Sequence, residues 1–144
     1  MAKFELSIEH VLKNEGGWSD HPDDSGKVTY RGITRKNFPN WVGWSKLDKW
    51  ITANGTPKTG KIFTEAEIPG LEKDCKDFYK QNFWIPIKGD EIINQSVAND
   101  IFDSSVNMGI SQAVKLTQRT LGIPETGKMD ITTLNTLNSQ NSYV

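Results

Sequence analysis

The chain has 144 residues, of which 35% are hydrophobic and 24% charged, so it holds enough apolar residues for one compact core and too many for a disordered chain. Its formal net charge is −1 and it contains no run of Lys or Arg, which argues against a nucleic-acid partner. Cys75 is the only cysteine, so an intrachain disulfide and a thiolate zinc cluster are excluded. None of these features predicts an oligomeric state.

The first predicted element is an amphipathic helix over residues 3–15. Its apolar residues share one helical face, and a glycine pair follows as a stop: Phe4, Ile8, Val11 and Leu12, then Gly16-Gly17. Charged residues interrupt this segment, so it lacks the apolar core of a signal peptide. No later segment is predicted to span a membrane, and we expect synthesis in the cytoplasm without a cleavable export signal.

Residues 16–40 are rich in Gly, Asp, Pro and Ser. They are predicted to form an irregular loop with a small extended element or hairpin near residues 28–33. An ordered loop of this length is more often functional than a passive connector. Residues 41–50 contain three tryptophans, and Asn54–Gly60 is predicted to be a turn-rich break.

Apolar residues at helical spacing predict four more helices, over residues 71–83, 97–106, 111–121 and 130–137. The expected stops are Pro86, Gly109 and Gly122, and the expected N-caps are Ser111 and Asp130. Cys75 and Trp84 are expected in the core. The predicted fold is therefore mainly α, in an α+β arrangement with one small extended element.

Glu15 is the residue that points most directly to chemistry. It continues the apolar face of the first helix and stands at the C-terminal end of that helix. Partial burial and the helix dipole both disfavour a carboxylate, so we expect a raised pKa, which a general acid needs. On position alone, a glutamate that turns into water or pairs with a lysine is an equal alternative.

Three carboxylates follow in the loop, at Asp20, Asp23 and Asp24. Glycosidases usually work with two carboxylates, one that donates a proton and one that activates water or attacks the sugar. An Asp cluster in a loop more often bonds to its own backbone, so the cluster alone indicates little.

The stretch EGGWSDHPDDSGKVTYRGIT (15–34) resembles the signature of glycoside hydrolase family 108, the N-acetylmuramidases found among phage endolysins and secretion-activator proteins. DFYKQNFW (77–84), FDSSVNMGISQAVKLTQRTLG (102–122) and TGKMDITTLNTL (126–137) resemble later parts of the same family, including its predicted peptidoglycan-binding region. The resemblance implies a lysozyme-like fold with a muramidase region over residues 1–86. It also implies a helical peptidoglycan-binding-like region over residues 87–144, packed with the first as one domain.

Phage-type lysozymes space their site as Glu, eight residues, Asp, five residues, Thr. Here the same register holds Glu15, Asp24 and Tyr30, which implies that Asp24 is the second carboxylate. Because tyrosine replaces threonine, Tyr30 and Thr29 are both candidates for the group that orients water. The chain also ends at Val144, before the C-terminal helix and tail common in the family, and truncation and a short natural variant would each explain this.

The loop also supplies the expected substrate-binding residues: Trp18, Asp20, His21, Arg31 and Thr34. Trp18 would stack on a sugar ring, although core packing is the commoner fate of a large aromatic residue. We predict no metal and no cofactor, because the chain has two histidines, no HExxH motif and no nucleotide-binding glycine pattern.

The resemblance implies a hydrolase that cleaves the β-1,4 bond between N-acetylmuramic acid and N-acetylglucosamine in peptidoglycan, and that reaches the cell wall or periplasm after release. The later helices are expected to form the second wall of a sugar-binding cleft. Two alternatives stay open from the sequence. One is a lytic transglycosylase, in which a single Glu suffices, and the other is a silent peptidoglycan-binding or secretion-accessory module.

Overall fold

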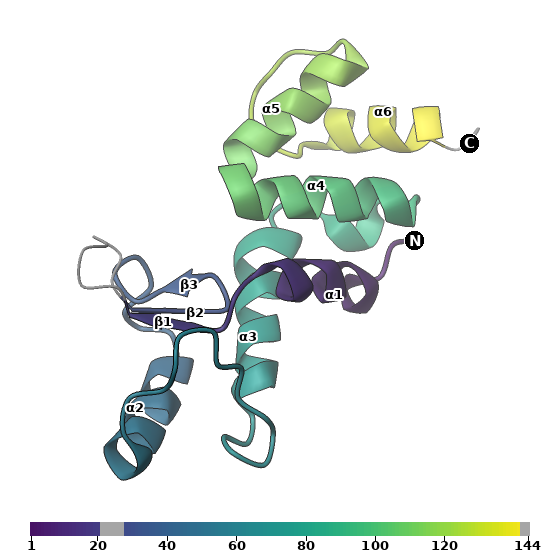
Figure 1. Cartoon of the computed structure of the whole chain (residues 1–144). Helices are drawn as coiled ribbons and strands as arrows, with labels where there is room; N and C mark the ends of the chain where they lie inside the picture. The colour runs from purple at the N-terminus through teal and green to yellow at the C-terminus, as the bar shows by residue number, and fades with distance from the viewer. Residues whose placement is uncertain (21–27, 142–144) are drawn as a thin grey trace. The chain divides into compact units, whose positions relative to one another are not determined.

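The computed structural model describes residues 1–20 and 28–141 (Figure 1). Contacts divide the chain into two compact units. We call Leu12–Phe78 the mixed unit, and Met1–Val11 together with Tyr79–Val144 the helical unit. Within the described residues, six α-helices and one three-stranded sheet confirm the predicted mainly α fold with a short extended element.

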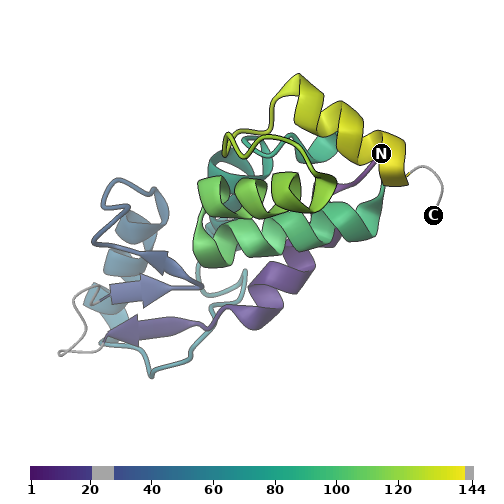
Figure 2. The same cartoon turned by 90° about the horizontal axis from the view of Figure 1, so that it is seen from above.

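The mixed unit contains an antiparallel sheet in the order β1-β2-β3, drawn as three neighbouring arrows in Figure 2. The strands are β1 (Trp18–Asp20), β2 (Val28–Tyr30) and β3 (Ile33–Thr34), followed by the helices α2 (Gly43–Asn54) and α3 (Leu71–Tyr79, whose last residue belongs to the helical unit). The sequence predicted the β2–β3 element and α3. It did not predict β1 or α2.

The helical unit begins with α1 (Phe4–Asn14), which crosses into the mixed unit after Val11. It continues with the π-helical turn η1 (Lys80–Trp84), the 3-10 turn η2 (Gly89–Glu91), and the helices α4 (Gln95–Met108), α5 (Ile110–Leu121) and α6 (Ile131–Asn141). At its centre Trp84 is fully buried, as predicted. Its ring centroid lies 5.7 Å from that of Phe4 and 5.4 Å from that of Phe102, in edge-to-face geometry.

Three of the four helix-end predictions for α4, α5 and α6 are confirmed, the first being Gly109, which directly follows α4. Asp130 Oδ1 accepts a 2.8 Å hydrogen bond from the Thr133 N–H in the first turn of α6, and Gly122 ends α5 with a φ of +73°. The N-cap predicted at Ser111 is wrong. Gly109 alone separates α4 from α5, so α5 begins at Ile110 and Ser111 lies inside its first turn.

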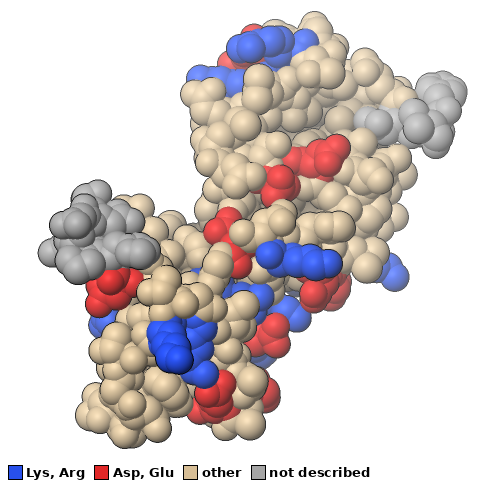
Figure 3. Space-filling view, viewed as in Figure 1, with Lys and Arg blue, Asp and Glu red and all other residues tan. Residues whose placement is uncertain are grey.

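Charges of both signs are interspersed on the face seen in Figure 3. Ion pairs within the mixed unit join Lys46 to Asp74 at 2.6 Å and Lys61 to Glu67 at 2.7 Å. No helix in the described part of the chain has the length and apolar character needed to cross a membrane.

Candidate functional site

Glu15 lies at the junction between α1 and β1. α1 ends at Asn14, and Glu15 follows it directly as a half-buried residue. Gly17, two residues after Glu15, lies against the backbone of residues 60–61: a Cβ added at Gly17 would lie 2.2 Å from the Lys61 carbonyl oxygen, so no side chain fits. At Gly16 a Cβ would meet nothing within 4 Å. The glycine pair therefore has one freely replaceable member and one that is required by close packing.

Two hydrogen bonds continue this contact along β1. The Trp18 N–H donates to the Lys61 carbonyl at 2.8 Å, and the Gly60 N–H donates to the Trp18 carbonyl at 2.7 Å. The segment at residues 60–61 thus holds the chain immediately after Glu15. The sequence predicts only a turn-rich break over Asn54–Gly60 and not this contact with β1. The glycine pair Gly16-Gly17 is the one feature of the sequence that indicates a close approach of the backbone.

The register of the sheet gives it two different faces. On one face Trp18 pairs with Tyr30 and Tyr30 with Ile33, and all three side chains are buried. On the other face Ser19 pairs with Thr29 and Thr29 with Thr34, and all three are half-buried. Because side chains alternate between faces along a strand, this pattern places three hydroxyl groups in a row across the sheet.

Tyr30 belongs to the core of the mixed unit. Its side chain is 1% exposed, and its hydroxyl accepts a 3.0 Å hydrogen bond from the Phe63 N–H. Burial raises the pKa of Tyr30 to about 12, so the phenol stays protonated at any physiological pH. Thr29, the other candidate for orienting water, lies on the opposite, hydroxyl-bearing face.

The remaining predicted residues are distributed around the same sheet. Trp18 is 4% exposed, so its ring packs in the core. Thr34 ends β3, and its hydroxyl is buried without a hydrogen-bond partner among the described residues. Asp20 is exposed at the end of β1, opposite Val28.

His21 and Asp24, together with Asp23, lie outside the described residues. The paired residues Asp20 and Val28 flank the segment that contains them. The part of the chain that the structure describes contains no cluster of three or more His, Cys, Asp or Glu side chains that could hold a metal ion.

Arg31 occupies the tight turn between β2 and β3. Its φ is +48°, and its side chain is only 11% exposed. The Nη2 group donates to the Leu12 carbonyl at 3.3 Å, and Nη1 lies 3.7 Å from a carboxylate oxygen of Glu72 on α3. The guanidinium thus points inward toward α1 and α3.

The three tryptophans of residues 41–50 make contacts inside the mixed unit. The indole N–H groups of Trp41 and Trp44 donate to the backbone carbonyls of Asp74 and Phe38, at 3.2 Å and 2.7 Å. Trp50 packs edge-to-face on Phe63, with 4.8 Å between ring centroids. These contacts favour packing over sugar stacking as the main role of these tryptophans.

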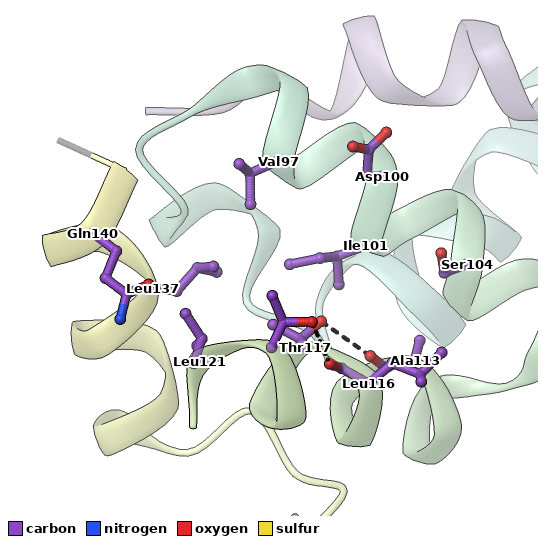
Figure 4. A pocket seen from close by; sticks show the side chains of 11 residues that line it. Val97, Asp100, Ile101, Ser104, Ala113, Leu116, Thr117, Leu121, Leu137 and Gln140 are labelled. Carbon is purple, nitrogen blue, oxygen red and sulfur yellow. Dashed lines mark hydrogen bonds between the residues drawn. The ribbon is translucent and has the colours of Figure 1, made fainter. Parts of the chain in front are cut away.

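A separate pocket opens in the helical unit between α4, α5 and α6, with a volume of about 460 Å³ (Figure 4). Asp100 is the one ionisable residue in its lining. The hydroxyls of Thr117 and Thr120 donate to the Ala113 and Leu116 carbonyls of their own helix, each at 3.0 Å. Glycosidases usually work with two carboxylates, so the lining of this pocket, with one, is not that of a typical glycosidase site.

Comparison with known proteins bears on the mixed unit most directly. The family model described as glycosyl hydrolase 108 matches residues 8–109, which include Glu15, the whole sheet, α2, α3 and α4. Among solved structures, the chain is similar to Brucella abortus SagA, with a TM-score of 0.62 and 27% sequence identity over 94% of this chain and 68% of that one. Comparison with curated proteins gave no match.

Proposed function

Because this chain belongs to the glycosyl hydrolase 108 family, we propose that it hydrolyses the β-1,4 bond between N-acetylmuramic acid and N-acetylglucosamine in peptidoglycan, with Glu15 as the proton donor. The observation that carries the proposal is the family match over residues 8–109, which spans Glu15 and the sheet that follows it. The half-buried position of Glu15, one residue beyond α1, supports the same role.

In the proposed reaction, Glu15 donates its proton to the glycosidic oxygen as the bond from that oxygen to the sugar carbon breaks. Asp24 is the second carboxylate, which either activates the attacking water or stabilises the positive charge that develops on the sugar. We assign the orientation of water to Thr29, because the hydroxyl of Tyr30 is engaged in the core.

Asp20, His21 and Thr34 are proposed to bind the glycan, since they flank Asp24 or share the hydroxyl-bearing face with Thr29. Trp18 is proposed to support this surface from the core side of the sheet. We also propose that residues 87–144 contribute to glycan binding, and that the protein reaches the cell wall after release from the cytoplasm.

The test is the rate of turbidity loss of purified peptidoglycan with wild type, Glu15→Gln and Glu5→Gln. Gln keeps the shape of the side chain and removes the proton, so Glu15→Gln should lose about 10²–10⁴-fold in rate at unchanged thermal stability. Glu5 is exposed in the first turn of the same helix, so Glu5→Gln should match wild type.

Full activity of a folded Glu15→Gln variant would contradict the assignment of the acid. A wild-type protein that sediments with peptidoglycan without clearing it would instead indicate a binding module. NMR of the product separates the remaining cases, because a 1,6-anhydro sugar identifies a transglycosylase. An α-anomer formed from the β-linkage identifies an inverting hydrolase, whose carboxylates lie about 6.5–9.5 Å apart.

A further inference from the structure

The turn between β2 and β3 has an unusual residue at its first position. Tyr30 pairs with Ile33, so Arg31 and Gly32 form a two-residue hairpin loop. Their φ angles are +48° and +83°, the positive values of a type I′ turn. Asn, Asp or Gly normally occupies the first position, because a longer side chain is strained in the left-handed region. Turn geometry alone therefore does not explain an arginine there.

The side chain of Arg31 supplies the explanation. α1 ends at Asn14, so the Leu12 carbonyl is among those at the helix end that lack an intrahelical partner. Arg31 Nη2 donates to this carbonyl across 19 positions of sequence, and the cation lies at the negative end of the helix dipole. Arg31 thus caps α1 from a different element.

The same guanidinium is also close to α3. Its Nη1 lies 3.7 Å from Glu72, whose side chain is 53% exposed, so the pair contributes orientation more than stability. A planar guanidinium can direct two nitrogens to two partners at once, whereas a lysine ammonium is a single point charge. Arg31 therefore joins the hairpin, the last turn of α1 and α3 inside the mixed unit.

We propose that Arg31 is a positioning residue that fixes the C-terminal turn of α1, and with it Glu15, relative to the β2–β3 hairpin. Leu12 is three residues before Glu15, so a shift of the last turn displaces the carboxyl group as well. The inference rests on the proposed function for its catalytic consequence. This positioning role takes the place of the substrate-binding role expected for Arg31 from the sequence, because the guanidinium is directed to the Leu12 carbonyl.

The test compares Arg31→Asn, Arg31→Lys and Arg35→Asn. Asn suits a type I′ turn better than Arg does, so Arg31→Asn keeps the hairpin and removes the guanidinium that contacts α1 and α3. Lys retains the charge and reaches only one partner. Arg35 is the matched control: it directly follows β3, and its guanidinium binds Asp48 at the surface, at 2.8 Å, with 40% of its side chain exposed.

Two measurements are made on the full chain. The first is kcat and KM on a soluble peptidoglycan oligosaccharide, where Arg31→Asn should lower kcat by about tenfold or more and leave KM within about twofold. The second is amide hydrogen exchange of residues 12–17, which should become about tenfold faster in Arg31→Asn. Arg35→Asn should change neither, and Arg31→Lys should recover part of kcat.

The two readouts separate this proposal from the proposed function. If wild type shows no hydrolysis, the proposed function fails, while the exchange measurement still decides whether Arg31 holds the end of α1. Unchanged exchange of residues 12–17 in Arg31→Asn would overturn the positioning role, as would a kcat within about twofold of wild type. If Arg31→Asn does not fold, Arg31→Lys tests the positioning role instead. A kcat and an exchange rate in Arg31→Lys that both equal those of wild type would overturn that role.

Discussion

Tyr30 shows how a single buried hydroxyl links the sheet to a distant segment. Its oxygen accepts the Phe63 N–H, a backbone donor that has no access to water at this buried position. The two rings also pack together, with centroids 5.8 Å apart. A hydroxyl at position 30 therefore matters for the stability of the mixed unit in a way that is independent of any role in catalysis.

We predict that Tyr30→Phe lowers the free energy of unfolding by about 1–3 kcal/mol at pH 7, because the Phe63 N–H loses its acceptor while the ring is retained. Urea unfolding of wild type and variant measures this difference. Equal midpoints at pH 7 would show that the hydrogen bond contributes nothing.

The raised pKa of Tyr30 predicts that the protein becomes less stable at alkaline pH. The folded-state pKa of Tyr30 is raised to about 12, above the value of 10.0 for an unperturbed tyrosine, so the folded state binds this proton more tightly. The contribution of the protonated phenol to the free energy of unfolding is therefore complete below pH 10 and is lost as the pH rises toward 12. Phenylalanine has no proton to lose, so the difference in free energy of unfolding between wild type and Tyr30→Phe, measured in urea, should become smaller between pH 10 and 12.

At the scale of elements, the junction between α1 and β1 depends on one glycine of the pair. We predict that Gly17→Ala destabilises the protein by about 1–3 kcal/mol, because its Cβ would overlap the Lys61 carbonyl and push β1 away from residues 60–61. Gly16→Ala, its matched control, should stay within about 0.5 kcal/mol of wild type, since the space around Gly16 is open.

Chemical unfolding of both variants, alongside turbidity assays, checks this prediction. Gly17→Ala should also lower activity, since the displaced segment begins two residues after Glu15. Equal stability of the two variants would mean that the backbone at Gly17 yields to a methyl group, and that the close contact is not needed to hold the junction.

The helices were predictable to different degrees, for physical reasons. α1, α4 and α5 carry buried apolar residues at helical spacing, and glycines follow α4 and α5 directly and α1 after one further residue, so sequence pattern alone located them. α2 was not predicted, although Trp44, Leu47 and Ile51 follow helical spacing, because no capping residue marks its start: Val42 stands at the N-cap and makes no side-chain hydrogen bond.

The sheet sets a stricter limit on prediction from sequence. β1 has three residues, too few for an alternating pattern to be recognised, and it forms through pairing with β2 and with residues 60–61. The position of Glu15 at the end of α1 was predictable, because it depends on a local helix. The inward direction of Tyr30 was not, because it depends on this non-local register.

At the scale of the whole molecule, the helical unit draws its core from both ends of the sequence. Phe4 comes from α1, Trp84 from η1 and Phe102 from α4, and their rings lie 5.4–5.9 Å apart. The Ala2 N–H also donates to the Ile92 carbonyl at 2.8 Å. Residues 87–144, the C-terminal region expected from the sequence, therefore contain only part of the core in which they are packed.

We predict that a fragment of residues 87–144 does not fold by itself. Phe102 is fully buried in the whole chain, and without Phe4 and Trp84 its ring would be exposed to water. Isolated helices as short as α4, α5 and α6 are marginal in water and need such packing. Circular dichroism should give the fragment much less helix per residue than the whole chain has, and no cooperative thermal transition. A cooperative transition would instead mean that the contacts among α4, α5 and α6 suffice, with Phe4 and Trp84 adding to a core that is already formed.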